Sequence, residues 1–183
     1  MKNKIAFIGA RGAGKSKISR KLSKRCDLPV FSTDTLVSYE AGGITIAELV
    51  KNSSWPAFRQ QEYDILEKLV GMKDVIIDCG GGILVEAPDA SQGRDEEAFS
   101  QRKFALLSAN CHIVYLRQSK EYLINKMSPD ANRPDLVGDY EKVLDRRLPW
   151  YENSADMVVD LENTKGRQAV NMILDEFSSL FQH

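Results

Sequence analysis

The sequence predicts an α/β fold in which a parallel β-sheet is covered by helices on both faces. Short apolar runs alternate with helical patterns along the 183 residues, and this alternation is typical of β-α-β units. The first apolar run leads into a glycine-rich stretch and then into a helical pattern, which is how such a unit begins. A chain of this length usually forms one domain with a substantial core. We therefore expect a single domain over residues 1–183.

Five apolar runs have the length and composition of buried strands. In chain order they are 4–8, 29–31, 74–77, 112–116 and 157–161. Helical patterns lie between or after them, at 15–25, 57–70, roughly 97–108, 119–127, 139–151 and 166–180. The segment 86–97, EAPDASQGRDEE, is polar and rich in turn formers, so we expect an exposed, mobile loop there.

Composition and charge limit the classes of partner. The 25 basic and 26 acidic residues nearly cancel, which argues against a nucleic-acid or membrane surface. No apolar run approaches the roughly 20 residues of a membrane span, and the first strand begins too close to Met1 for a signal peptide. The three cysteines lack zinc-type spacing, which predicts free thiols in a reducing compartment. We expect a cytoplasmic protein that works as a monomer.

The stretch GARGAGKS, residues 9–16, matches the phosphate-binding loop G-x-x-x-x-G-K-[ST]. Three of its residues allow backbone angles that a Cβ would forbid: Gly9, Gly12 and Gly14. The backbone N–H groups of this loop, that of Ala13 included, are expected to line an anion site at a helix N-terminus. Lys15 is predicted to reach the terminal phosphates of a nucleotide, and the Ser16 hydroxyl to bind Mg²⁺.

Two further polar residues lie where the sheet would bring them towards this loop. Asp34 follows the second strand in VFSTDTLV, either as a helix N-cap or as a carboxylate that orients an acceptor hydroxyl in phosphoryl transfer. Arg59 lies in FRQQE. It fits a solvated helix face in contact with Glu62, or a guanidinium that binds a substrate carboxylate while Glu62 holds its orientation.

A glycine triplet and three arginines complete the candidate residues. The triplet follows the strand sequence VIIDC and consists of Gly80, Gly81 and Gly82. Three glycines in an ordinary turn cost unfolded-state entropy, so they favour close approach of backbone to a ligand. Arg133 lies in the loop NRPDL and suits a mobile lid. Arg146 and Arg147 lie in DRRLPWY, and a surface position is the alternative for all three arginines.

The order of these features resembles the shikimate kinase family. In sequence they are GARGAGKS, an aspartate after strand two, FRxxE, GGG after strand three, RP, and RxPxY as RLPWY from Arg147 to Tyr151. The resemblance covers about residues 4–160. It implies a nucleoside-monophosphate-kinase-like αβα sandwich with a five-stranded parallel sheet of order 2-3-1-4-5. It also implies MgATP-dependent phosphorylation of the 3-hydroxyl of shikimate in aromatic amino-acid biosynthesis.

The resemblance also implies roles for individual residues. Asp34 would bind the shikimate hydroxyls and act as base or orienter, and Arg59 and Arg147 would clamp the carboxylate. The glycine triplet would present backbone to the ring, and Arg133 would be the lid arginine. Lys126 falls where the family often has an arginine that stacks on adenine. A substrate-binding helical segment is expected at about 35–70 and the lid at about 128–138.

Three residues depart from the family pattern. Ser32 stands where the family usually has an acid that contributes to the magnesium shell through water. Lys17, in the expected nucleotide site, replaces a frequent threonine. Asp78 ends the third strand, where a small or apolar residue is usual, and the connection from Gly82 to the fourth strand is longer than usual. Our hypothesis is that Asp78 takes over the magnesium role that position 32 has lost; the alternative is a cap of the glycine turn.

Two rival interpretations remain open at this point. The first is a kinase for another anionic sugar-like acid such as gluconate, against which FRxxE and GGG argue. The second is a protein that binds nucleotide or shikimate without turnover, which the serine at position 32 favours.

Overall fold

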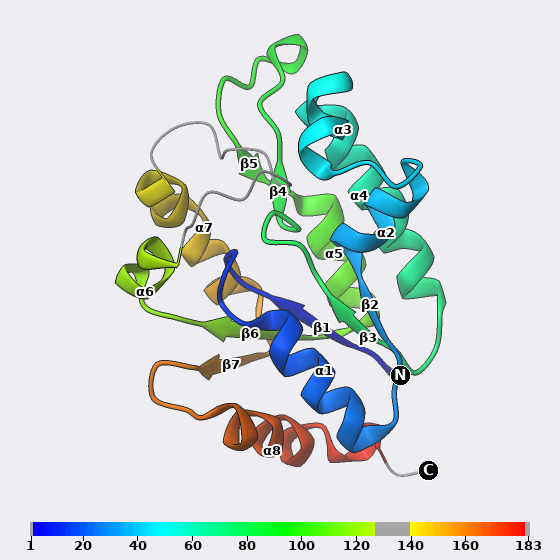
Figure 1. Ribbon diagram of the computed structural model, residues 1–183, viewed down its shortest axis with the longest axis vertical. Helices are drawn as coiled ribbons and strands as arrows, with labels where there is room; N and C mark the ends of the chain where they lie inside the picture. Colours follow the sequence, from blue (N-terminus) through cyan, green and yellow to red (C-terminus); the bar gives the residue numbers. More distant parts are fainter. Residues whose placement is uncertain (1, 127–139, 182–183) are drawn as a thin grey trace.

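The computed structural model describes residues 2–126 and 140–181. Its centre is a five-stranded parallel sheet. The strands are β1 (Ile5–Ile8), β2 (Val30–Ser32), β3 (Ile76–Asp78), β6 (His112–Arg117) and β7 (Met157–Asp160). Their order across the sheet is β2-β3-β1-β6-β7 (Figure 1). Strands β4 (Val85–Glu86) and β5 (Ala98–Phe99) form a separate hairpin. Without them the order is 2-3-1-4-5 along the chain, and the predicted sheet is confirmed.

Helices follow or connect the strands as predicted, with two additions. They are α1 (Lys15–Cys26), α2 (Thr33–Glu40), α3 (Ile46–Asn52), α4 (Trp55–Gly71), α5 (Gln101–Asn110), α6 (Lys120–Asn125), α7 (Tyr140–Ser154) and α8 (Gly166–Glu176), with short 3₁₀ turns η1 (Ala90–Gln92) and η2 (Ser178–Leu180). The additions to the six predicted helical patterns are α2 and α3, which fall within or next to the helical segment that the resemblance implies at about 35–70. Their signals are local: Ser32 caps α2, and Thr45 with Glu48 forms a capping box at α3.

The sheet has a buried layer on each face. Along the fully buried β1, Ile5 and Phe7 pack in a core that α1 and α8 complete. Ala6 and Ile8 point the other way, into a core shared with α4, α5 and α7. Successive side chains of a strand point to opposite faces, so a strand covered on both faces is apolar throughout. This three-layer arrangement is visible in Figure 1.

The register of three strands brings their carboxyl ends level. Asp78, the last residue of β3, pairs with Phe7 of β1 and with Ser32 of β2. The loops that follow these strands therefore start at the same edge of the sheet, where ligands of open α/β folds bind. These loops carry the glycine-rich stretch, the start of α2 and the glycine triplet.

The segment 86–97 is not a plain loop. It begins in β4, passes through η1 and ends just before β5, and a bridge between Asp89 and Arg94 closes its tip. Ala90 and Ser91 at the tip are exposed, as expected, but Glu97 is engaged in an ion pair with Arg147. The helix expected from about 97 begins at Gln101 instead, because Ser100 caps it and the preceding residues pair in β5.

All three cysteines are free thiols, as predicted: Cys26, Cys79 and Cys111. Burial raises the pKa of the Cys111 thiol to about 11. In the two described stretches of the chain, none of the helices has both the length and the apolar character needed to cross a lipid bilayer.

Candidate active site

The loop 9–16 has the geometry of an anion-binding site. Gly9, Gly12 and Gly14 all have positive φ angles, of 140°, 83° and 97°, which side chains rarely adopt. No described side chain caps the first turn of α1, because its N-cap is Gly14. The Lys17 N–H already donates to the Gly14 carbonyl at 3.0 Å. The helix dipole favours an anion at the N–H groups that precede it. The buried Lys15 donates to the carbonyl oxygens of Gly9 and Ala10 at 2.8 and 3.0 Å.

Asp34 lies in the first turn of α2 and packs against the glycine triplet. The N-cap interpretation of Asp34 is wrong, because Ser32 is the N-cap and its Oγ accepts from the Thr35 N–H at 3.3 Å. A Cβ on Gly80 would collide with Oδ1 of Asp34. The Gly80 N–H donates to the hydroxyl of Thr33 at 2.8 Å. The lack of a side chain at Gly80 thus leaves room for the Asp34 carboxylate.

Arg59 is buried, so a solvated helix face is the wrong interpretation of this residue. Its side chain is 4% exposed, and its Nη1 lies 3.0 Å from Oε2 of Glu62, one turn further along α4. The guanidinium also lies over the rings of Trp55 and Phe58, at 5.4 and 5.0 Å from their centroids. A Cβ on Gly82 would overlap this guanidinium, so the third glycine makes room for Arg59.

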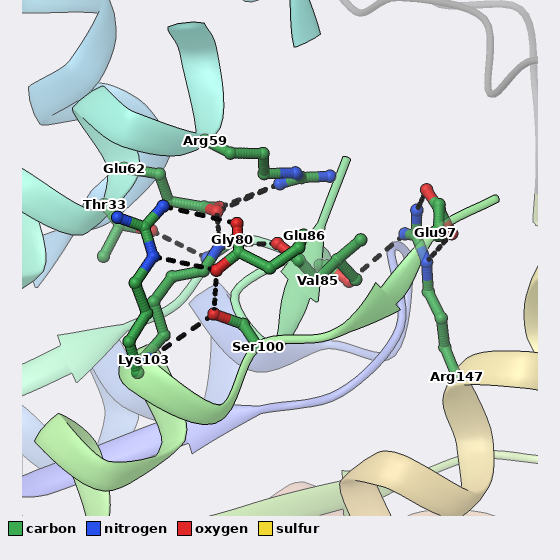
Figure 2. Close-up of polar contacts among 12 residues, drawn as sticks. Thr33, Arg59, Glu62, Gly80, Val85, Glu86, Glu97, Ser100, Lys103 and Arg147 are labelled. Carbon is green, nitrogen blue, oxygen red and sulfur yellow. Dashed lines mark hydrogen bonds and ion pairs between the residues drawn. The ribbon is translucent and has the colours of Figure 1, made fainter. Parts of the chain in front are cut away.

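A buried lysine joins this cluster from α5. Lys103 donates to Oε2 of Glu62 at 2.8 Å and to the carbonyl of Val85 at 2.7 Å. Figure 2 shows both cations joined to the Glu62 carboxylate. Burial would raise the pKa of Glu62, but the charges of Lys103 and Arg59 outweigh burial and hold this pKa below its usual range.

Arg147 is also buried and is held by contacts from two directions. Its Nε donates to Glu97 at 3.0 Å, and a second nitrogen contacts the other carboxylate oxygen (Figure 2). Its Nη1 lies 3.5 Å from the carbonyl oxygen of Gly81, which also accepts from the hydroxyl of Tyr151. Burial raises the pKa of Tyr151 to about 12, so this hydroxyl remains a donor at neutral pH. Arg146, the other arginine of the pair, is more exposed, at 28%.

One pocket collects most of the predicted substrate residues. Its lining combines charged groups with apolar side chains and glycine backbone: Arg11, Asp34, Ile46, Trp55, Phe58, Arg59, Glu62, Gly81, Gly82 and Arg147. Both arginines and the aspartate therefore face one space, although they come from three different helices. Arg11 was not among the predicted substrate residues. It belongs to the glycine-rich loop, which forms one wall of the pocket.

A second pocket lies on the α1 side of Asp34. Its lining includes Ser16, Ser32, Asp34, Thr35 and Asp78, and Asp78 itself is buried. The cap interpretation of Asp78 finds no support at the triplet, because Thr33 takes the Gly80 N–H. The described residues contain no cluster of three or more metal-ligating side chains. The oxygen donors of Ser16 and Asp78 nevertheless suit Mg²⁺, which binds proteins through one or two carboxylates and keeps several waters.

The remaining predicted residues lie at the edge of the site or outside the described chain. Lys17 is exposed on the first turn of α1. Lys126 is exposed at the end of α6, and a Cβ on Gly12 would lie 3.5 Å from its Cβ. Arg133 and the expected lid at 128–138 lie outside the described residues. Near that gap, the Tyr140 hydroxyl donates to the carbonyl of Arg11 at 3.3 Å.

Comparisons with known proteins agree with this architecture. The family model of shikimate kinase matches residues 11–178. A shikimate kinase of Leptospira biflexa is 44% identical over 173 residues, 93% of each chain. One from Leptospira borgpetersenii is 38% identical, over 95% of this chain and 97% of the relative.

Solved structures show the same fold. A shikimate kinase from Acinetobacter baumannii in complex with shikimate superposes with a TM-score of 0.79, at 23% identity, and covers 96% of this chain and 93% of that one. The enzyme from Aquifex aeolicus superposes with a TM-score of 0.73, at 19% identity, and covers 96% of both chains. At such identities the likeness concerns the fold alone. Family membership rests instead on the family model and the Leptospira relatives, and by these the chain belongs to the shikimate kinase family.

Proposed function

We propose that this protein transfers the γ-phosphoryl group of ATP to the 3-hydroxyl of shikimate, as a cytoplasmic monomer in aromatic amino-acid biosynthesis. The observation that carries the proposal is the position of Asp34, which lines both pockets. An acceptor hydroxyl beside Asp34 has the arginines on one side and the glycine-rich loop on the other. Phosphoryl transfer requires the acceptor hydroxyl to lie in line with the phosphoryl group and its leaving oxygen. Positioning these groups and stabilising their charge is most of what the protein contributes.

The nucleotide is bound by the loop 9–16 in this proposal. The N–H groups from Gly9 to Ser16, those of Gly12, Ala13 and Gly14 included, surround its phosphates. Lys15, which bridges two loop carbonyls, shifts its ammonium to the terminal phosphates, where it stabilises the charge of the transition state. Lys17 and Lys126, both exposed near the loop, contribute from its rim.

Shikimate occupies the pocket lined by Arg59 and Arg147. It carries one carboxylate and three hydroxyls, and a pair of guanidiniums with one aspartate answers that set of groups. The apolar faces of Trp55 and Phe58 suit the carbon ring. Gly81 and Gly82 line the same pocket and present their backbone to the ring, and Asp34 orients the acceptor hydroxyl and accepts its proton.

In this proposal Ser16 and Asp78 are the residues that would hold magnesium, which would supply positive charge to neutralise the phosphates. These residues line one pocket and offer the hard oxygen donors that this ion prefers. Asp78 supplies the carboxylate that Ser32 cannot, since a hydroxyl is neutral at pH 7.

Release of ADP tests the proposed reaction. We expect MgATP turnover with shikimate and little with gluconate or quinate. Turnover with gluconate in place of shikimate would identify a different small-molecule kinase. Calorimetric binding of shikimate and nucleotide without ADP release would identify a protein that binds these ligands and does not catalyse the reaction.

A further inference from the structure

Lys103 is a fully buried lysine that lies outside the lining of the substrate pocket and is joined to it by its ion pair with Glu62. Its side chain is 0% exposed, and its ammonium donates to Glu62 and to the Val85 carbonyl. Burial lowers the pKa of Lys103, and the charge of Glu62 opposes this shift. A lysine is rarely fully buried unless it is paired, so its position beside Glu62 needs a reason beyond packing.

A second acid near Lys103 is already paired. Glu86 lies near Lys103, but its carboxylate accepts from Arg102 at 2.9 Å and also from the hydroxyl of Ser100. Within the described chain, the ion pairs of Arg59 and Lys103 both go to Glu62. Two buried cations thus share a single carboxylate, so the ion pairs of this cluster join two positive charges to one negative charge.

This cluster lies beside the substrate pocket. Arg59 lines the pocket whereas Lys103 does not, and the buried Nε of Arg59 finds no hydrogen-bond partner among the described residues. In a low-dielectric interior a charge without a counter-charge is costly. A bound carboxylate would remove that cost.

We propose that Lys103 is a positioning residue that sets the affinity of the pocket for the substrate carboxylate, by taking up the negative charge of Glu62 that would otherwise neutralise Arg59. The inference rests on the proposed function, because it assumes an anionic substrate at Arg59. Without Lys103, Arg59 and Glu62 form a self-neutralised pair. The guanidinium of Arg59 then keeps its position, but it attracts an incoming anion less strongly.

The first test replaces the lysine by a neutral side chain of similar length. Lys103→Met is expected to raise both the KM and the calorimetric Kd for shikimate about tenfold, less than direct loss of a buried charge partner, because Lys103 acts on the substrate through Glu62. The KM for ATP should stay within about twofold of the wild-type value, because Lys103 lies beside the substrate pocket and the nucleotide is proposed to bind at the loop 9–16. Lys68→Met is the matched control: Lys68 lies on α4 with Arg59 and Glu62, but its side chain is 62% exposed and pairs with Glu40.

A second variant separates charge from packing. Glu62→Gln added to Lys103→Met removes the carboxylate together with its counter-charge and leaves an acceptor for Arg59. We expect the double variant to regain part of the shikimate affinity that Lys103→Met loses, because the charge that neutralised Arg59 is gone; some loss remains because Glu62 itself lines the pocket. A role in packing alone predicts that the double variant binds as weakly as Lys103→Met or more weakly, and that result would overturn the inference.

The two proposals fail in different ways. A wild-type chain that neither binds nor phosphorylates shikimate overturns the proposed function and this inference with it. A wild-type chain that does both, while Lys103→Met keeps its shikimate Kd within twofold, overturns the inference alone. Should Lys103→Met not fold, the double variant decides by its own Kd, and a tenfold weaker Kd in a folded double variant counts against the charge argument.

Discussion

The guanidinium of Arg147 donates two hydrogen bonds to the carboxylate of Glu97, one from Nε to Oε2 at 3.0 Å and one from Nη2 to Oε1. Glu97 comes from the hairpin and Arg147 from α7, so the contact ties an unusually long connection to the substrate pocket. Glu97 is not itself part of the pocket lining, whereas Arg147 is. A second carboxylate, that of a substrate, would have to share this guanidinium with Glu97.

We predict that Glu97→Gln strengthens shikimate binding. Glutamine keeps the shape and one acceptor for Arg147, so the arginine stays oriented, but the competing negative charge is gone. The expected fall in the KM for shikimate is about two- to fivefold, the size of a partly exposed charge interaction of less than about 1 kcal/mol. Steady-state kinetics measure it, with Glu96→Gln on the exposed neighbour as control. A raised KM would mean that Glu97 supports substrate binding instead of competing with it.

Gly82→Ala should damage binding more than stability. The added methyl would meet the end of the Arg59 side chain, which can move away at little cost to the fold but then loses its place in the pocket. We expect the KM for shikimate to rise about tenfold or more, as for loss of a charge-assisted pair, with a small change in melting temperature. Gly71→Ala is the control, because its Cβ would meet nothing within 4 Å. Equal effects of both substitutions on KM would contradict the role of Gly82.

Lys15→Ala should lower kcat at least about a hundredfold, which is typical for loss of one preorganised group that stabilises transition-state charge. Lys15 lies at the base of the glycine-rich loop, where the terminal phosphates are proposed to bind. Lys24→Ala, on the exposed last turn of the same helix, should leave turnover almost unchanged. Near-normal turnover in Lys15→Ala would remove the proposed phosphate site.

Asp78→Asn should raise the Mg²⁺ concentration needed for half-maximal rate and leave the KM for shikimate almost unchanged. The substitution preserves shape and removes the charge proposed to attract the ion. Ser32→Asp in the same variant should recover part of the loss, because Ser32 pairs with Asp78 across the sheet and lines the same pocket. The compensation hypothesis fails if the magnesium titration of Asp78→Asn overlays that of wild type.

The segment 128–138 should become resistant to protease when nucleotide binds. This prediction comes from the sequence, since Arg133 is proposed to reach the phosphates as the segment closes. Limited proteolysis with and without an ATP analogue measures it. Equal cleavage in both conditions would argue against a closing lid.

Much of the site could be predicted because its residues belong to short sequence motifs. The loop 9–16, Asp34, and the pairing of Arg59 with Glu62 follow from motifs in which few residue types can serve. The glycine triplet can also be recognised from the sequence, and its approach to a ligand stays a prediction. The structure adds why it is needed: two of the three glycines make room for Asp34 and Arg59.

Lys103 and Glu97 could not be found in the same way. A lysine on an amphipathic helix is normally exposed, and nothing in QRKFALL distinguishes the buried position of Lys103 from an exposed one. Glu97 lies in a polar stretch that reads as loop, and its partner is 50 residues away. Thr33 was missed because STDT offers several possible caps, and the sequence does not say which hydroxyl faces the glycine turn.

In the connection between β4 and β5, changes of length at the tip and changes of length next to Glu97 have different consequences for the pocket. Beyond the bridge between Asp89 and Arg94, a Cβ added at Gly93 would meet nothing within 4 Å. The tip can therefore become longer or shorter without disturbing the pocket. Next to β5 the situation is reversed, because Glu97 directly precedes Ala98, and a residue inserted between these two would move the Glu97 carboxylate away from Arg147. Relatives are therefore free to vary the tip, while any that keep an acidic partner for the arginine must keep the spacing below it.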